Sequence, residues 1–340
     1  MIEELKERAR RLERDLRRVG KKSKTTVRLY EGLSGGRRRL YLEVGRLRGR
    51  LAGNGAKPGG IDPKNLVWIF GSGRSGSTWL RGMMAEVEGV RFWEEPMVGR
   101  LFGEFYARST RQEKRSADFI LGDPIRRGWI GSIRTFILEG AAFSNPRLNP
   151  DDLLVVKEPN GSVGAPLIME ALPESRMVLL IRDPRDVVAS VVDAAAEGGW
   201  LYERRTAAKG RARAGKKPVA FAVARARAYR RGVENALRAF DAHRGPKALV
   251  RYEDLVADTA GSLSRILSGL GIPAAEGEPA RIAQRHSWEN VPTEEKGRGK
   301  FYRKGTPGGW RDDLTPAQVE VVEKITGPLI DRFYPGGRTH

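Results

Sequence analysis

The sequence predicts an α/β fold of three layers, in which helices cover both faces of a central parallel β-sheet. Short and almost continuously apolar runs recur along the chain, and helix-like stretches lie between them. Such runs are typical of parallel strands that are buried on both faces. Their alternation with helices indicates strand–helix–strand units. We therefore expect an α/β domain over residues 61–340, preceded by a separate segment over residues 1–60.

The N-terminal segment differs in character from the rest of the chain. Its apolar residues from Ile2 to Val19 are spaced alternately three and four apart, as in a helix with one apolar stripe. Residues 1–50 hold 17 Lys and Arg against 7 Asp and Glu, which is half of the net charge of +20. We expect a basic helix over residues 1–20, followed by a linker. This helix either packs on the body, pairs with a second copy in a homodimer or contacts a membrane peripherally.

The main domain contains the elements that define the fold. The predicted strands are Leu66–Phe70, Leu153–Val156, Met177–Ile181 and Ala248–Val250. The predicted helices are Trp79–Val87, Val163–Leu172, Val187–Ala195 and Val219–Phe240. A last helix is expected to begin at Thr315, because Thr-Pro-Ala-Gln forms a capping box with proline at the first helical position. Ligands of parallel sheets bind beyond the carboxyl ends of the strands, so the polar residues there are the candidate site.

The composition excludes several kinds of protein. The chain has no cysteine, which excludes disulfides, thiolate catalysis and cysteine-ligated zinc. Its three histidines make a histidine-rich metal centre or a Ser-His-Asp triad hard to build. The N-terminus is charged, and no apolar run approaches the roughly 18 residues of a membrane span. We therefore expect no transmembrane helix, no secretory signal, no metal, and a cytoplasmic or membrane-peripheral location.

The first candidate binding feature is the loop GSGRSGST, Gly71 to Thr78, which follows the first predicted strand. It is similar to the phosphate-binding loop G-x-x-x-x-G-K-[ST], except that Ser77 stands in the place of the lysine. The nearest cation, Arg74, lies inside the loop. Backbone N–H groups at such a turn and at a helix N-terminus can hold an anion. The alternative is a Gly- and Ser-rich turn without a ligand.

Three later features can contribute to the same site. In RDPRDVVAS, Arg182 closes a strand and Ser190 lies in the next helix, so the two can converge on a second phosphate. RKGTPGGW, which begins at Arg303, offers a basic pair beside a glycine. Trp288 can stack on a nucleotide base. The alternatives are an ordinary strand–helix turn, a solvated loop and a structural tryptophan.

In this order, the features resemble the motifs of the sulfotransferase family, whose donor is 3′-phosphoadenosine 5′-phosphosulfate (PAPS). The first loop is similar to the 5′-phosphosulfate loop of that family, and RDPRDVVAS to its 3′-phosphate motif. RYEDL at Arg251 is similar to its late strand-and-turn motif, and RKGTPGGW to its RKGxxGDW loop, with Gly309 replacing Asp. The resemblance covers Leu66 to Trp310 and does not cover residues 1–60. It implies the product 3′,5′-ADP and no catalytic metal.

The resemblance also implies a set of donor-binding residues. Those expected at the 5′-phosphosulfate are Arg74, Ser75, Gly76, Ser77 and Thr78. Those expected at the 3′-phosphate are Arg182, Ser190, Arg303, Lys304 and Gly305, with Tyr229 nearby. Trp79 and Trp288 are similar to residues that contact the adenine.

The catalytic base cannot be the histidine that the phenol- and steroid-sulfating branch carries in its Lys-Thr-His motif. Here the segment reads KEPN, with Lys157 kept and a proline in the histidine position. The tyrosylprotein branch has a similar loop and a following Glu-Glu pair, of which the second is the base. We therefore predict Glu95 as the base, with Glu94 and Glu158 as alternatives, and Lys157 and Arg74 as charge-stabilising residues. The other interpretation is that Glu94 and Glu95 are only a solvated or ion-paired surface pair.

Other functions stay open at this point. A P-loop kinase of a small molecule is the first alternative, although the loop lysine and an obvious Walker B aspartate are missing. A nucleic-acid-binding protein would explain the charge but not the ordered motifs, so we expect no specific nucleic-acid partner. A catalytically inactive PAPS-binding protein is the third. The acceptor is a glycan, glycolipid, peptide or small alcohol, and the basic segment 201–218 is either a lid over it or a surface loop.

Overall fold

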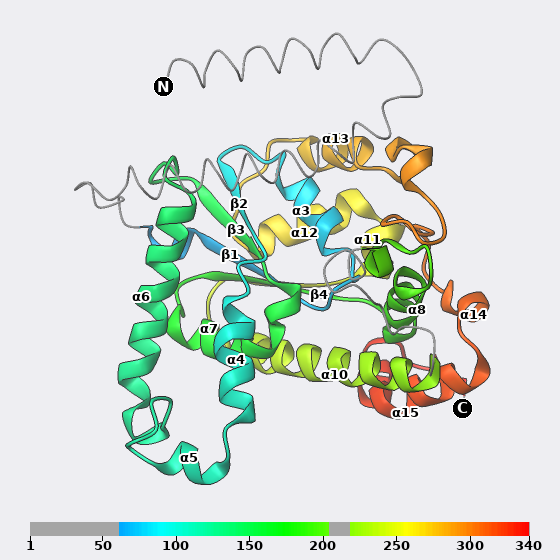
Figure 1. Ribbon diagram of the computed structural model, residues 1–340. Helices are drawn as coiled ribbons and strands as arrows, with labels where there is room; N and C mark the ends of the chain where they lie inside the picture. The colour runs from blue at the N-terminus through cyan, green and yellow to red at the C-terminus, as the bar shows by residue number, and fades with distance from the viewer. Residues whose placement is uncertain (1–60, 204–217, 340) are drawn as a thin grey trace, which may run out of the picture. The chain divides into compact units, whose positions relative to one another are not determined.

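A five-stranded parallel sheet lies at the centre of the computed structural model, which describes residues 61–203 and 218–339 (Figure 1). Its strand order is β2-β3-β1-β4-β5. The strands are β1 (Leu66–Phe70), β2 (Val90–Glu94), β3 (Leu153–Lys157), β4 (Arg176–Ile181) and β5 (Lys247–Arg251). The predicted helix and linker before residue 61, and most of the basic segment 201–218, lie outside the described residues.

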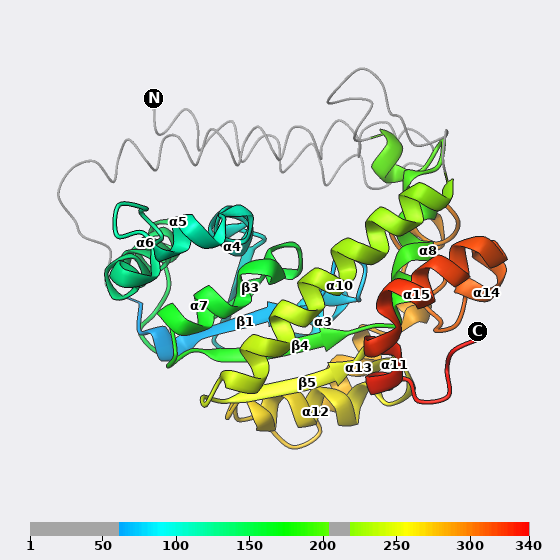
Figure 2. The same ribbon diagram turned by 90° about the horizontal axis from the view of Figure 1, so that it is seen from below.

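Helices cover both faces of this sheet, which confirms the predicted three-layer α/β class (Figure 2). One layer is α4 (Val98–Arg108), α6 (Arg126–Ser144), α7 (Ala165–Ala171), α10 (Pro218–Ala242) and α15 (Pro316–Phe333). The other is α3 (Ser77–Met84), α12 (Thr259–Gly269) and α13 (Glu278–Arg285). Alternate residues of β1 enter the two cores, Trp68 on one side and Val67 on the other. The apolar run of β1 is continuous because both of its faces are covered.

The remaining elements connect these layers. The helices are α5 (Arg111–Arg115), α8 (Pro184–Ala195), α11 (Tyr252–Ala257) and α14 (Trp310–Asp313). The 3₁₀ turns are η1 (Pro63–Asn65), η2 (Asp123–Ile125), η3 (Pro159–Gly164), η4 (Trp288–Asn290) and η5 (Thr293–Glu295). Among the described residues, none of the helices combines the length and the apolar character that crossing a bilayer requires.

The four predicted strands are present, and the last helix starts with the predicted capping box of Thr315 and Gln318. The predicted helix over 163–172 is in part the end of η3, and α7 begins only at Ala165. Strand β2 was not predicted. It lies at the edge of the sheet and mixes exposed Arg91 and Glu94 with apolar residues, so it has no continuous apolar run.

Helix α4 packs directly on the η3 turn through glycines. A Cβ on Gly99 would lie 2.2 Å from the carbonyl oxygen of Gly161, and one on Gly103 would lie 2.4 Å from the Cα of Gly164. This close approach fixes the start of α4, and with it the short connection from β2 that carries Glu95. The two backbones can approach this closely only where no Cβ stands between them.

We predict that Gly103→Ala destabilises the protein and that Gly131→Ala does not. Gly103 has no space for a methyl group, so overpacking should lower the free energy of unfolding by about 1–3 kcal/mol. Gly131 lies on the exposed side of helix α6, where a Cβ would have nothing within 4 Å, so alanine should raise stability by about 0.5–1 kcal/mol. Urea unfolding of both variants measures the difference. Equal stability of the two would contradict the described packing.

Candidate active site

The loop after β1 forms a tight turn at the carboxyl edge of the sheet. Arg74 and Gly76 adopt left-handed backbone conformations, with φ of 72° and 93°. A Cβ on Gly76 would lie 2.6 Å from the ring of Tyr252, so glycine is required there. The hydroxyls of Ser72 and Ser75 are buried and have no hydrogen-bond partner within the described part of the chain. Buried polar groups normally have partners, so these two hydroxyls indicate a ligand.

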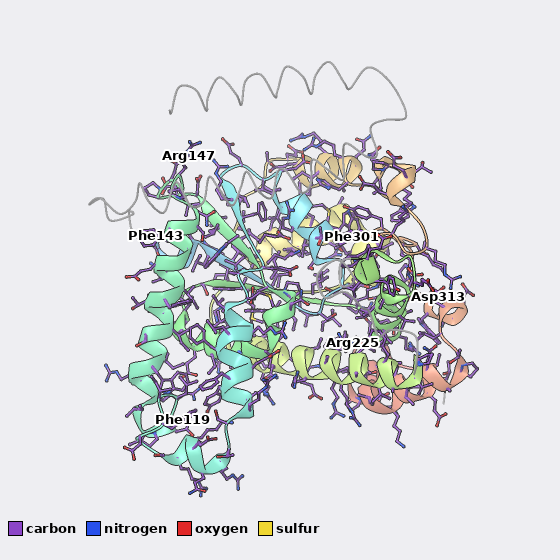
Figure 3. The ribbon with its side chains drawn as sticks, in the orientation of Figure 1. Phe119, Phe143, Arg147, Arg225, Phe301 and Asp313 are labelled. Carbon is purple, nitrogen blue, oxygen red and sulfur yellow. The ribbon has the colours of Figure 1, made fainter. Side chains whose placement is uncertain are left out.

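Arg74 turns its side chain toward distant parts of the chain. Its Nε donates a hydrogen bond to Oγ of Ser190 at 3.0 Å, and Nη2 donates to the carbonyl oxygen of Phe301 at 2.6 Å. The guanidinium also lies over the rings of Phe301 and Trp200, 4.7 and 5.6 Å from their centres. Phe301 is labelled beside α8 in Figure 3. Phe301 belongs to the loop over residues 301–309, which precedes α14 and which we call the C-terminal loop. The loop after β1, helix α8 and the C-terminal loop therefore meet at the side chain of Arg74.

Two further arginines crowd this position. Arg182 donates from Nη1 to the carbonyl oxygen of Arg74 at 3.1 Å, and its buried Nε has no partner in the described residues. Burial and the charges of Arg182 and Arg303 lower the pKa of Arg74 to about 10. Positive charges that repel one another in a buried place favour binding of an anion. Arg182 and Ser190 both contact Arg74, and their predicted binding of a second phosphate stays a prediction.

The basic pair Arg303 and Lys304 is held by acidic residues of α14. Arg303 donates to the carboxylate of Asp313, and the ammonium of Lys304 lies 3.1 Å from Asp313 and 3.3 Å from Asp312. Asp313 is labelled at α14 in Figure 3. The next residue, Gly305, lies against Trp288, since a Cβ on Gly305 would come within 2.4 Å of that ring.

Asp186 fixes the same C-terminal loop from the start of α8. Its carboxylate is fully buried and accepts hydrogen bonds from the backbone N–H groups of Gly308 at 2.7 Å and Trp310 at 2.9 Å. Sequence reasoning missed this role, because an aspartate in a strand–helix turn has many possible partners. Two residues of the motif RDPRDVVAS, Arg182 and Ser190, therefore contact Arg74. A third, Asp186, holds the C-terminal loop.

The aromatic residues expected around the donor have different contacts. Trp79 donates from Nε1 to the carbonyl oxygen of His286 at 2.8 Å and meets Tyr252 edge to face. Tyr229 is buried and donates its hydroxyl to the carbonyl oxygen of Arg182 at 2.6 Å. Burial raises the pKa of Tyr229 well above its ordinary value. This geometry supports the turn that carries Arg182, and a direct contact of Tyr229 with a phosphate stays a prediction.

A second polar cluster surrounds Lys157, at the end of β3. Its Nζ lies 2.5 Å from Oε1 of Glu94, 2.9 Å from Oε1 of Glu95 and 3.2 Å from Oγ1 of Thr78. Lys157 is buried, whereas both carboxylates are partly exposed. The parallel register of β2 and β3 places Glu94 opposite Lys157, which explains how the two meet. One ammonium therefore contacts the glutamate pair and the first turn of α3.

Glu95 is held more firmly than Glu94. Its Oε2 accepts a hydrogen bond from Nδ2 of Asn160 at 2.9 Å, and its backbone N–H donates to the carbonyl oxygen of Lys157 at 3.0 Å. Its φ of 43° is unusual for a residue with a side chain. Asn160 also lies against the loop after β1, since a Cβ on Gly73 would come within 2.9 Å of its Oδ1. Sequence reasoning missed Asn160, which is three residues after Lys157.

The third glutamate has a structural position. Glu158 is fully buried, and its carboxylate accepts hydrogen bonds from the backbone N–H groups of Met97 at 3.0 Å and Gly99 at 3.1 Å. Burial raises the pKa of Glu158 to about 7, although these N–H groups favour the ionised form. The side chain caps the start of α4 and is closed off from a bound molecule. Among the described residues, no group of three or more histidine, aspartate or glutamate side chains could hold a metal ion.

Comparison with known proteins gives a family and a fold. A family model described as the sulfotransferase family matches residues 67–276. The structure of mouse sulfotransferase SULT7A1 complexed with PAP is similar at 15% identity and a TM-score of 0.50, over 79% of this chain and 86% of that one. Sulfotransferase STF9 from Mycobacterium avium is similar at 13% identity and a TM-score of 0.51, over 82% of this chain and 79% of that one. No curated protein matches the chain.

We predict that Asp186→Asn loosens the C-terminal loop. The backbone N–H groups of Gly308 and Trp310 donate to the carboxylate of Asp186, and the NH₂ group of an asparagine would face one of them without accepting its hydrogen bond. The free energy of unfolding should therefore fall by about 1–3 kcal/mol. Trypsin should then cleave faster after Arg303 and Lys304, as followed by mass spectrometry. Asp118→Asn, which changes an exposed carboxylate that does not contact Arg303 or Lys304, is the matched control. Unchanged cleavage in the Asp186 variant would show that its two hydrogen bonds do not hold the loop.

Proposed function

The chain belongs to the sulfotransferase family, and we propose that it transfers a sulfuryl group from PAPS to a hydroxyl or amine of an acceptor. The observation that carries this proposal is the hydrogen bond between Arg74 and Ser190. It joins the loop after β1, which the family resemblance assigns to the 5′-phosphosulfate, with the helix assigned to the 3′-phosphate. A ligand with two separate anionic groups fits such a junction.

The unsatisfied groups of the site support PAPS as the ligand. The hydroxyl of Ser75 and Nε of Arg182 are buried donors without partners in the described residues, and each can donate to an anionic oxygen. The first turn of α3 adds the partial positive charge of a helix N-terminus. The residues proposed to hold the 5′-phosphosulfate are Arg74, Ser75, Gly76, Ser77 and Thr78. Those proposed for the 3′-phosphate are Arg182, Ser190, Arg303, Lys304 and Gly305, with Trp79 and Trp288 at the adenine.

PAPS supplies the sulfuryl group. A bond forms between the acceptor oxygen and sulfur, and the bond between sulfur and the phosphate oxygen breaks. The electron pair of the broken bond stays on the phosphate oxygen of the product 3′,5′-ADP. Glu95 accepts the proton of the acceptor hydroxyl. Lys157 adjoins Glu95 and Thr78 at once, so its charge acts on both the base and the oxygens of the transferred group. Arg74 contributes positive charge from within the loop.

Glu95 is the proposed base because its position is better defined than that of Glu94. Asn160 and Lys157 each hold one of the two oxygens of Glu95. Glu94 also has a partner at each oxygen, Lys157 and Arg81, whose Nε is 3.3 Å away, but its side chain is more exposed than that of Glu95, at 48% against 34%. Fixed orientation of a catalytic group contributes strongly to rate. The acceptor stays within the classes that the sequence left open, namely a glycan, a glycolipid, a peptide or a small alcohol.

We predict that the protein binds 3′,5′-ADP without a metal ion and more tightly than ATP with Mg²⁺. The reason is that Arg182 and Ser190 offer a place for a 3′-phosphate, which ATP lacks. Isothermal titration calorimetry with both ligands measures the ratio of the two affinities. Adenosine 5′-diphosphate, which has no 3′-phosphate, is the control. Tighter binding of ATP with Mg²⁺ would instead favour the kinase alternative.

We also predict that Glu95→Gln lowers turnover by about 10²–10⁴-fold, the usual contribution of a general base. Glu94→Gln should cost much less, because Glu95 retains its contacts with Lys157 and Asn160. The measurement is transfer of labelled sulfate from PAPS to the acceptor that a screen of the four acceptor classes identifies. Binding of 3′,5′-ADP should be unchanged in both variants. A larger loss for Glu94→Gln would reverse the assignment.

A further inference from the structure

Exposed apolar side chains are concentrated in one part of the molecule. Nine large hydrophobic side chains are exposed among the described residues, and six of them lie between residues 101 and 143. These six are Leu101, Phe105, Ile120, Ile125, Phe136 and Phe143. They belong to the segment 98–147, which contains α4, α5 and α6 and which we call the α4–α6 lobe. Such a concentration marks an interaction surface, whereas single exposed apolar residues are ordinary.

The exposed side chains of the lobe are connected by aromatic contacts. Phe102 meets Phe136 edge to face, with ring centres 5.5 Å apart, and Phe105 meets Phe119 at 6.1 Å. Phe136 and Phe143 are seven residues apart on α6 and therefore share one side of that helix. Figure 3 labels Phe119 and Phe143 toward opposite ends of the lobe. Exposed apolar side chains therefore lie on both α4 and α6, and Phe105 and Phe136 each contact a half-buried aromatic ring of the lobe.

The lobe is also positively charged. Residues 98–147 hold nine Lys and Arg against five Asp and Glu. Arg111 and Arg115 of α5 and Arg127 of α6 are exposed and form no ion pair within the described residues. By contrast, Arg100 and Arg108 both pair with Glu104. Arg111 and Arg115 thus lie on α5 and Arg127 in the first turn of α6, and Arg147, also exposed and without an ion pair in the described residues, follows α6.

We propose that the α4–α6 lobe docks on the surface of an anionic lipid bilayer. Its exposed Phe, Leu and Ile side chains enter the boundary between head groups and acyl chains, and Arg111, Arg115 and Arg127 bind anionic head groups. A second copy of the chain fits this surface less well, because an interface between two copies would enclose unpaired arginines between two net-positive surfaces. The docking does not depend on the proposed function.

A fluorescence measurement tests which part of the molecule meets the lipid. The chain has no cysteine, so a single cysteine can carry a polarity-sensitive fluorophore. Ser132→Cys places it on the exposed side of α6, and Ser268→Cys places it on α12, which covers the other face of the sheet. With phosphatidylserine-containing vesicles, we expect a blue shift at position 132 and none at position 268. Vesicle binding without a shift at position 132 would overturn the proposal.

A sedimentation assay with lobe variants of the full chain completes the test. Phe105→Ser combined with Phe136→Ser should lower partitioning onto these vesicles at least tenfold, also at high salt, where attraction by basic segments elsewhere is screened. Arg111→Glu should lower it at low salt. Val219→Ser and Arg231→Glu, at exposed positions of α10, are the matched controls and should bind normally. Thermal unfolding checks that the variants are folded.

Two results of the assay would overturn the docking proposal. One is wild-type binding by the lobe variants, which would assign the lipid contact to another part of the chain. The other is that the wild-type protein does not bind vesicles but forms a dimer that the lobe variants do not form. This result would make the lobe an interface between copies.

Discussion

The half-buried guanidinium of Arg74 connects the parts of the chain on which the candidate site depends. It donates to Ser190 of α8 and to the carbonyl oxygen of Phe301, while Arg182 donates to the carbonyl oxygen of Arg74 itself. The loop adopts this arrangement only because Arg74 and Gly76 accept left-handed backbone conformations. Burial and repulsion by the charges of Arg182 and Arg303 disfavour the charged form of Arg74, and Asp193 offsets this effect only in part. A bound anion would offset that repulsion.

The glutamate pair depends on a different constraint, the edge strand β2. Its register with β3 places Glu94 beside Lys157, and Glu95 follows in the short connection to α4. Glu158 caps that helix, and the glycine contacts with η3 fix its position. The α4–α6 lobe is therefore joined to the proposed base through only a few residues of chain.

The sequence was sufficient for four of the five strands and for the residues with a distinctive local pattern. Continuous apolar runs predicted β1, β3 and β4 because both faces of these strands are covered. The short run Ala248–Val250 predicted β5 at one edge of the sheet, although Leu249 is exposed there. The ordered motifs assigned Arg74 to one anionic group of a ligand and Arg182 and Ser190 to another, and the direct contacts of Arg74 with both residues were not predicted. Strand β2 was missed because an edge strand tolerates exposed polar residues. The roles of Asn160 and Asp186 were missed because they depend on long-range contacts, which no local pattern encodes.

The most direct test of the account is a double-mutant cycle on binding of 3′,5′-ADP, measured by calorimetry. The wild-type protein is compared with Arg74→Ala, Ser190→Ala and the double variant. If Arg74 and Ser190 act together on the ligand, each substitution weakens binding, and the effects are non-additive by about 0.5–3 kcal/mol. Unchanged affinity in Arg74→Ala, or strictly additive effects, would contradict the claim that this pair joins the two halves of the donor site.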